Sequence, residues 1–250
     1  CNIPVTTTLM GKGAIPCRHE LNLGMLGSHG SYVANYAVHN ADLLIILGAR
    51  VGDRAMGTAY KIAKKATVVH IDIDPAEIGK NIHVSIPIVG DAGAVLADLL
   101  EIVEECSFEA WNKTIARIKS EHPPVYDCSE ESRFVNPKYV LSTMSDMVDE
   151  DAIITTEVGQ NQIWAANHFK TKKPGTFISS GGMGTMGYGL PSAVGAKIGR
   201  PESKVITISG DGSFQMSMQE LGTIKQYKLG VKIIIFNNSR LGMVRELQKV

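Results

Sequence analysis

Two short polar segments in the second half of the sequence carry residue types that bind divalent cations. Gly210-Asp211-Gly212-Ser213 follows a run rich in Val and Ile, and Asn237-Asn238 follows another such run. Alone, each segment is usually a turn. Together they offer a carboxylate and an amide oxygen, which are hard ligands of the kind that Mg²⁺ shares with phosphate groups. The pair therefore predicts a magnesium-bound diphosphate, with the N–H groups of Gly212 and Ser213 at a helix N-terminus facing the anion.

The elements around these segments should bring them together. The sequence predicts strands over 204–209 and 231–236, joined by one crossover helix, which makes the two strands parallel. Asp211 and Asn238 then leave the same carboxyl edge of the sheet, where open α/β folds bind ligands.

The whole chain has the same alternating character. Short runs rich in Val and Ile alternate with helical segments, which predicts an α/β protein with two doubly wound parallel-sheet domains. We expect a first domain over 1–106, a linker over 107–136 that contains Pro123-Pro124, and a second domain over 137–250. The predicted strands lie at 4–7, 42–47, 67–72, 86–89, 152–156, 175–179, 204–209 and 231–236. The predicted helices lie at 31–39, 55–64, 92–106, 108–121, 137–148, 162–167, 191–198 and 216–228.

Composition limits the partners and the compartment. The 250 residues include 25 Lys+Arg and 25 Asp+Glu, and this balance gives no reason to expect nucleic acid or an anionic membrane. The longest clean apolar run, Leu43–Ala49, is far too short to span a bilayer. The four cysteines form no metal-binding or disulfide pattern, which favours a cytoplasmic protein with free thiols. Because the chain begins at Cys1 and ends at Val250, we expect a piece of a longer polypeptide, truncated at both ends.

The paired segments lie among further motifs that resemble one family. Gly210-Asp211-Gly212 with Asn237-Asn238 is similar to the thiamine-diphosphate signature of the pyruvate-decarboxylase-like enzymes. The surrounding sequence resembles the catalytic large subunits of the acetolactate synthase (acetohydroxyacid synthase) family over the whole chain. The matching segments are 25–30 (MLGSHG), 158–160 (VGQ), 185–191 (TMGYGLP) and 238–244 (NSRLGMV).

The resemblance implies roles for residues of the second half. The metal ligands would be Asp211, Asn238 and the main-chain carbonyl of Arg240. Met186 would support the bent conformation of thiamine diphosphate, and Met243 and Arg54 would lie near the substrate. The other cofactor-binding positions that it implies here are Val158, Gly159, Gln160, Asn161 (often His in the family), Gly184, Gly210, Gly212 and Ser213.

For the first half, the resemblance implies FAD binding. The matching positions are Thr8, Leu9, Leu26, Gly27, Ser28, His29, Gly48, Ala49, Arg50, Asp72, Ile73, Asp91 and Ala92. The residues themselves leave nucleotide binding open, because no GxGxxG motif is present. Two positions depart from the family: Gly52 replaces an acid that contacts flavin, and Ser28 stands where Met is common. A third, Leu247, replaces a Trp that favours 2-ketobutyrate.

The implied reaction joins two 2-keto acids. Pyruvate would lose CO₂ and be ligated to a second pyruvate or to 2-ketobutyrate, in the synthesis of valine, leucine and isoleucine. The family assembles as homodimers or homotetramers with active sites at subunit interfaces, and a small regulatory subunit is an expected partner. Its catalytic glutamate lies in an N-terminal domain, so we expect the 250 residues alone to be inactive. Three alternatives remain. The first is another thiamine-diphosphate carboligase or decarboxylase acting on glyoxylate, oxalyl-CoA or sulfoacetaldehyde. The others are a non-catalytic nucleotide-binding relative and an unrelated doubly wound domain whose motifs match by chance.

Overall fold

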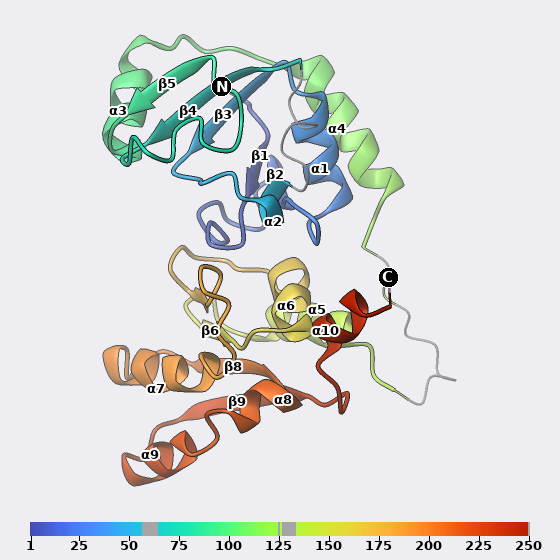
Figure 1. Cartoon of the computed structure of the whole chain (residues 1–250), viewed down its shortest axis with the longest axis vertical. Helices are drawn as coiled ribbons and strands as arrows, with labels where there is room; N and C mark the ends of the chain where they lie inside the picture. Colours follow the sequence, from blue (N-terminus) through green and yellow to red (C-terminus); the bar gives the residue numbers. More distant parts are fainter. Residues whose placement is uncertain (57–64, 125, 127–133, 250) are drawn as a thin grey trace. The chain divides into compact units, whose positions relative to one another are not determined.

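The chain folds into two compact units. A computed structural model describes residues 1–56, 65–124, 126 and 134–249, and the side chains of Arg54 and Met56 lie outside the description. The first unit comprises residues 1–8 and 20–123, and the second comprises residues 9–19 and 124–250. Each unit is an α/β fold with parallel sheets (Figure 1).

Two small parallel sheets form the first unit. One pairs β1 (Val5–Thr7) with β2 (Asn22–Met25), and the other has the order β3 (Leu43–Leu47), β4 (Thr67–Asp72), β5 (Ile86–Val89). The described helices are α1 (Tyr32–Asn40), α2 (Asp53–Met56), α3 (Ala92–Ile102) and α4 (Glu109–Glu121). Helix α1 contributes to two hydrophobic clusters. Val38 packs with residues of β3 and β4. Val33 and Ala34 pack against α4, on Ile115 and Ile118.

A single parallel sheet organises the second unit. Its order is β7 (Phe177–Ser179), β6 (Ile153–Thr156), β8 (Val205–Gly210), β9 (Val231–Phe236). The described helices are α5 (Pro137–Met147), α6 (Gln160–His168), α7 (Gly189–Gly199), α8 (Asp211–Gln215), α9 (Glu220–Gln226) and α10 (Gly242–Leu247).

Alternation along the strands explains why helices cover both faces of this sheet. Ile154, Ile206 and Ile208 pack on one face with side chains of α5 and α6. Ile153 and Val205 point to the other face and pack against Ala193 of α7. Both faces are therefore apolar, as expected for a parallel sheet buried on both sides.

The predicted fold class is confirmed, with local differences. All eight predicted strands form within two residues of their expected bounds. Strand β2 was missed because Asn22 and Gly24 are poor strand formers. Of the helix expected over 216–228, only residues 220–226 form a helix, α9, and the separate short helix α8 precedes the expected range at 211–215. Most of the helix expected over 55–64 lies outside the described residues.

The two compact units also differ from the expected domain bounds. Helix α4 falls in the stretch expected to be a linker, yet Ile115 and Ile118 are buried against α1, so the first unit extends to Pro123. Residues 9–19 group with the second unit instead of the first. There the Lys12 ammonium donates to the Phe169 carbonyl over 2.9 Å and lies 5.2 Å from the centre of the Phe177 ring.

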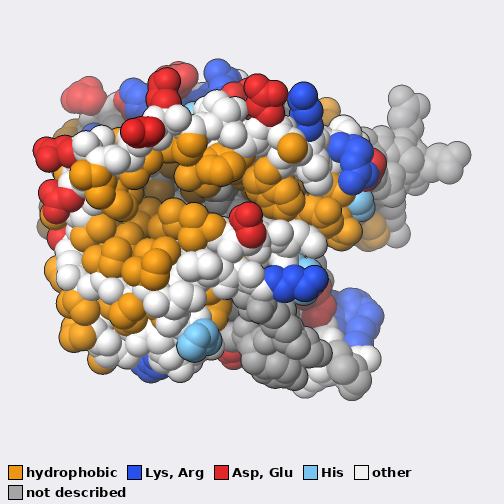
Figure 2. All heavy atoms as spheres, turned by 90° about the horizontal axis from the view of Figure 1, so that it is seen from above, with side chains coloured by type: hydrophobic (Ala, Val, Ile, Leu, Met, Phe, Trp, Pro, Cys, Tyr) orange, Lys and Arg blue, Asp and Glu red, His pale blue; other side chains and the backbone are white. Residues whose placement is uncertain are grey.

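Part of the apolar surface remains exposed. Figure 2 shows hydrophobic side chains gathered on the face seen from above. The exposed large apolar residues of β3, β5 and α3 are Leu43, Ile45, Leu47, Ile86, Val89, Leu96, Leu100 and Ile102. Extended exposed apolar areas are typical of surfaces that contact another protein. No helix among the described residues is long and apolar enough to cross a membrane.

His168 should make the stability of the second unit depend on pH. Burial, helped by the nearby charges of Lys138 and Lys12, lowers the pKa of His168 to about 4. Unfolded histidine titrates near pH 6.5, so between about pH 6.5 and 4 the unfolded state binds a proton that the folded state does not. We expect the free energy of unfolding to fall as pH decreases through this range.

The measurement is urea unfolding of the chain at a series of pH values. His168→Gln should reduce this pH dependence, whereas His83→Gln, at an exposed histidine of the first unit, should leave it unchanged. An unaltered slope in His168→Gln would show that other groups cause the dependence.

Candidate functional site

One pocket of the second unit contains every cofactor and metal position predicted for that half of the chain. It is formed where β6, β8 and β9 end, together with the loop before α7 and the start of α10. The predicted residues that line it are Val158, Gly159, Gln160, Asn161, Gly184, Met186, Gly210, Asp211, Gly212, Ser213, Asn238, Arg240 and Met243.

Strand register brings the two proposed metal-ligand segments together. Gly210 of β8 pairs with Phe236 of β9, so both chains leave the sheet at the same level. The Asn238 backbone N–H donates to the Asp211 carboxylate over 3.3 Å, and the Arg240 N–H donates to the Asn238 side-chain oxygen over 3.0 Å. Carboxylate and amide oxygens accept more than one bond, so both retain lone pairs for a cation.

This donor set fits magnesium. Asp211 supplies a carboxylate, Asn238 an amide oxygen and Arg240 a main-chain carbonyl, which are all hard oxygen ligands. Among the described residues, no group of three or more His, Cys, Asp and Glu side chains could hold a metal.

The segment after β6 forms the facing wall. Gln160 accepts a hydrogen bond from the Asn238 amide over 3.2 Å and donates to Glu246 of α10. The Asn161 amide nitrogen donates to the backbone carbonyls of Glu157 and Ile208, each over 3.2 Å. Those bonds tie the end of β6 to β8. The side-chain N–H groups of Asn161, a predicted cofactor-binding residue, are therefore used within the protein and not on a diphosphate.

Ser213 is also used internally. Its hydroxyl exchanges hydrogen bonds of 3.2 Å with the Gly210 N–H and carbonyl and is buried. These bonds close the first turn of α8, which begins at Asp211. Ser213 thus stabilises the turn of backbone that carries Asp211 directly after β8.

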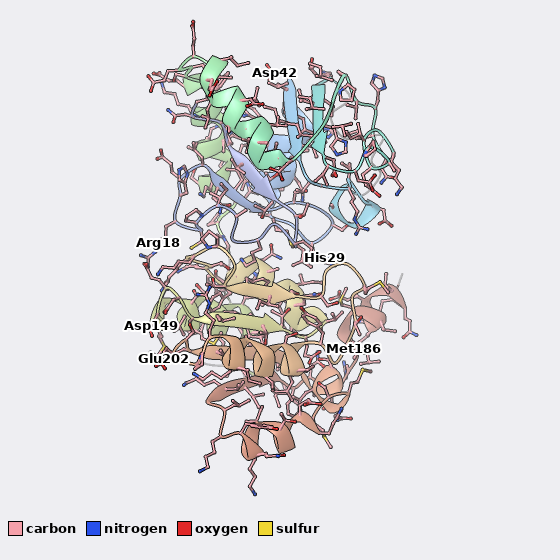
Figure 3. The ribbon with its side chains drawn as sticks, turned by 90° about the vertical axis from the view of Figure 1, so that its left-hand side faces the viewer. Arg18, His29, Asp42, Asp149, Met186 and Glu202 are labelled. Carbon is pink, nitrogen blue, oxygen red and sulfur yellow. The ribbon has the colours of Figure 1, made fainter. Side chains whose placement is uncertain are left out.

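Apolar side chains give the pocket its remaining shape. Met186 lies in the loop between β7 and α7 (labelled in Figure 3), and Met243 lies at the start of α10. Five other lining residues had no predicted role: Leu241, Gly242 and Val244, which lie in the matching segment 238–244, and Trp164 and Phe236, which lie outside the matching segments. Trp164 could have been found, because it lies one helical turn after Asn161 on the same face of α6.

In the first unit, the predicted FAD positions follow the carboxyl ends of strands. Thr8 follows β1, Leu26–His29 follow β2, Gly48–Arg50 follow β3, and Asp91 and Ala92 follow β5. Asp72 ends β4, and Ile73 follows it. Leu9 is grouped with the second unit. The carboxylates have local roles here: Asp72 accepts from the Asp74 N–H and Asp91 caps α3 through the Ala94 N–H, both over 2.9 Å.

Side chains from neighbouring elements hold two of these loops. Asn35 of α1 makes two hydrogen bonds to the backbone of Gly27, of 2.9 and 3.0 Å. The carbonyls of Ala49 and Arg50 accept from His70 and Asn81 over 3.1 and 3.0 Å. Val51 has a φ of 50°, which is strained for a β-branched residue. Arg54 belongs to α2, but its side chain lies outside the described residues.

Comparisons with known proteins identify the two halves of the chain. Residues 1–99 match the central domain of thiamine pyrophosphate enzymes, and residues 157–250 match their C-terminal TPP binding domain. Thiamine pyrophosphate is the same compound as thiamine diphosphate. The pocket described above lies in the second of these matched regions.

Curated relatives match over nearly the whole chain. A probable acetolactate synthase large subunit of Methanocaldococcus jannaschii is 49% identical over 99% of this chain and 43% of its own length. A similar protein of Methanococcus aeolicus is 46% identical over 100% of this chain and 44% of its own. The acetolactate synthase large subunit of Lactococcus lactis is 44% identical over 99% and 43%. The chain spans less than half the length of these relatives.

Both domain matches fall in the expected order, and the relatives align across both. The chain therefore belongs to the thiamine pyrophosphate enzymes and is a homologue of the acetolactate synthase large subunits.

Proposed function

We propose that this chain forms the central and cofactor-binding parts of an acetolactate synthase large subunit. The reaction is decarboxylation of pyruvate and carboligation to a second pyruvate or to 2-ketobutyrate, giving 2-acetolactate or 2-aceto-2-hydroxybutyrate. The observation that carries the proposal is the meeting of Asp211, Asn238 and Met186 in one pocket. The chain's 44–49% identity to proteins of that name supports it.

The cofactors proposed for this pocket are thiamine diphosphate and Mg²⁺. Asp211, Asn238 and the Arg240 carbonyl would hold the metal, and the metal would bind the diphosphate. The backbone N–H groups of Val158, Gly159 and Gln160 would contact the diphosphate from the opposite wall, since the Asn161 donors are already used. When bound, thiamine diphosphate supplies the electron sink for decarboxylation.

The protein's own residues orient the reactants. Met186 supports the thiamine from the loop before α7. Met243 borders the second keto acid with apolar surface, and Leu247 on α10 leaves more room than a larger aromatic residue. The role that the resemblance implies for Arg54, pairing with the substrate carboxylate, stays a prediction, because its side chain lies outside the described residues.

FAD is the proposed ligand of the first unit. Five loops that follow parallel strands carry its expected contacts, and ligands of open α/β folds bind at such edges. The side chains of Asn35, His70 and Asn81 hold two of these loops in place. A loop that is already held in place loses less conformational entropy when a nucleotide binds.

The proposed assembly is a homodimer or homotetramer with a small regulatory subunit. The exposed apolar side chains of β3, β5 and α3 offer surface for such contacts. We propose a cytoplasmic location, in which Cys1, Cys17 and Cys106 remain the free thiols seen here.

Another thiamine-diphosphate carboligase is the second candidate. It would use the same metal and diphosphate residues, so Asp211 and Asn238 do not separate the two. The relatives named above favour acetolactate synthase, and the substrate test below distinguishes them.

Removing the Asp211 charge should weaken metal-dependent cofactor binding. Of the chain's two tryptophans, Trp164 lines the pocket, so a Trp111→Phe background makes fluorescence report on the pocket. Titration with thiamine diphosphate should change this signal only when Mg²⁺ is present. Asp211→Asn should weaken binding by more than about tenfold, since a metal ligand is lost.

Asp149→Asn is the matched control, because that carboxylate pairs with Lys204 outside the pocket. Equal binding by Asp211→Asn and the parent chain would contradict the metal assignment.

The reaction itself is best tested in a chimera. These 250 residues replace the aligned segment of the Lactococcus lactis relative, which supplies the rest of the subunit. The chimera should form 2-acetolactate from pyruvate in a Mg²⁺-dependent manner, and Asp211→Asn should prevent it. Cofactor binding without acetolactate, but with turnover of glyoxylate, oxalyl-CoA or sulfoacetaldehyde, would favour the second candidate.

Flavin binding should depend on Gly48. This glycine has a φ of 57°, a conformation that a β-branched residue adopts only with strain. Gly48→Val should therefore remove the flavin absorption of the purified chimera and leave thiamine diphosphate binding intact. Gly175→Val is the control, because Gly175 also has a positive φ, of 72°, but lies before β7. Flavin retained in Gly48→Val, or absent from the parent chimera, would contradict the FAD assignment.

A further inference from the structure

Glu157 is a buried acid next to two segments that line the pocket. It follows β6 directly and is fully buried. Its Oε2 accepts from the Gly187 N–H over 2.7 Å. Its Oε1 accepts from the Gly189 and Leu190 N–H groups over 2.9 and 3.2 Å. Both carboxylate oxygens are thus bound to one short stretch of backbone thirty residues away.

That stretch is held tightly against the end of β6. The Thr155 hydroxyl donates to the Gly189 carbonyl over 2.9 Å. A Cβ at Gly189 would lie 2.7 Å from the Glu157 nitrogen and 2.8 Å from the Thr156 carbonyl carbon. Only glycine fits there, so backbone and carboxylate together fix where α7 begins.

The N–H groups at the start of α7 need an acceptor. The first N–H groups of a helix have no partner within it, and a negative charge there is favourable. Glu157 supplies both the acceptor oxygens and the charge. Burial raises the pKa of Glu157 above its usual value, whereas the backbone N–H bonds from Leu190 and Gly187 oppose this rise.

The loop before α7 is fixed at its other end as well. The buried Gln162 side chain donates to the Ser179 hydroxyl over 2.7 Å and to the Ser180 carbonyl over 3.1 Å. The Thr185 N–H donates to the Ser180 hydroxyl over 3.1 Å. Met186 therefore sits between two anchors, and Glu157 is the anchor immediately after it.

Both neighbourhoods of Glu157 line the cofactor pocket. Val158 to Gln160 follow it in sequence, and Gly184 and Met186 precede the N–H groups that it binds. A shift of its carboxylate would move Met186 relative to Val158–Gln160, the segment proposed to contact the diphosphate.

We infer that Glu157 is a positioning residue of the cofactor site, which holds Met186 at the distance from Val158–Gln160 that thiamine diphosphate requires. This inference rests on the proposed function, because the ligand is the one proposed there. Glu157 is not assigned any contact with the cofactor itself. Its effect passes through the loop that ends at Gly187.

The test separates thiamine recognition from diphosphate recognition. Dissociation constants for thiamine diphosphate and for inorganic pyrophosphate are measured with Mg²⁺ by Trp164 fluorescence, in the Trp111→Phe background. Glu157→Gln keeps the size of the side chain but places an amide N–H₂ against a backbone N–H. It should raise the dissociation constant for thiamine diphosphate relative to that for pyrophosphate, so that their ratio increases by about tenfold. The reason is that an unsatisfied buried donor displaces the Met186 loop. Glu157→Asp, which keeps the charge on a shorter side chain, should raise it less.

Leu141→Val is the matched control for stability. Leu141 of α5 is fully buried in the core of the same unit but does not line the pocket. It should lower the urea midpoint without changing the ratio. If Glu157→Gln fails to fold, Glu157→Asp decides the question.

Ratios that stay unchanged in the folded Glu157 variants would overturn the inference and reduce Glu157 to a structural role. A parent chain that binds neither ligand would overturn the proposed function, and the inference with it. Parent binding with unaltered ratios would overturn the inference alone.

Discussion

The parallel pairing of β6, β8 and β9 is the constraint on which the site depends. Their register aligns Thr156 with Ile208 and Gly210 with Phe236, so three chains leave the sheet along one edge. Each strand begins with an apolar residue and is followed by a polar residue at that edge. The sheet therefore concentrates a carboxylate, amides and backbone N–H groups at one edge.

Alignment of the strand ends would not suffice without bonds across them. The Asn161 amide joins the carbonyls of Glu157 and Ile208, and thus fixes the end of β6 against β8. Glu157 fixes the same strand end to the start of α7. Glu157 and Asn161, which make these bonds, directly precede and follow Val158–Gln160 in the sequence. This segment therefore has little freedom to move. A preorganised wall costs less ordering entropy when an anion binds.

Much of this could be predicted from the sequence, and the omissions have physical causes. The apolar periods located the strands, and the positions of Asp211 and Asn238 after two of them predicted their meeting. Helix α4 was expected as a helix but assigned to a linker, because its polar composition hides the burial of Ile115 and Ile118 on α1. Glu157 was not found, because an acid after a strand is ordinary and its partners are backbone N–H groups distant in sequence.

In the first unit the predicted contacts also follow the carboxyl ends of parallel strands, but backbone conformation shapes its loops. Asp72 and Asp91 make local turn and cap bonds, so their loops are shaped before any ligand binds. Gly48 and Val51 both have positive φ, and the carbonyls between them accept from His70 and Asn81. His70 is fully buried, and its Nδ1 has no partner among the described residues. Strain in Val51 is tolerated because these two side chains hold the loop, and strained loops of this kind occur at ligand sites more often than elsewhere.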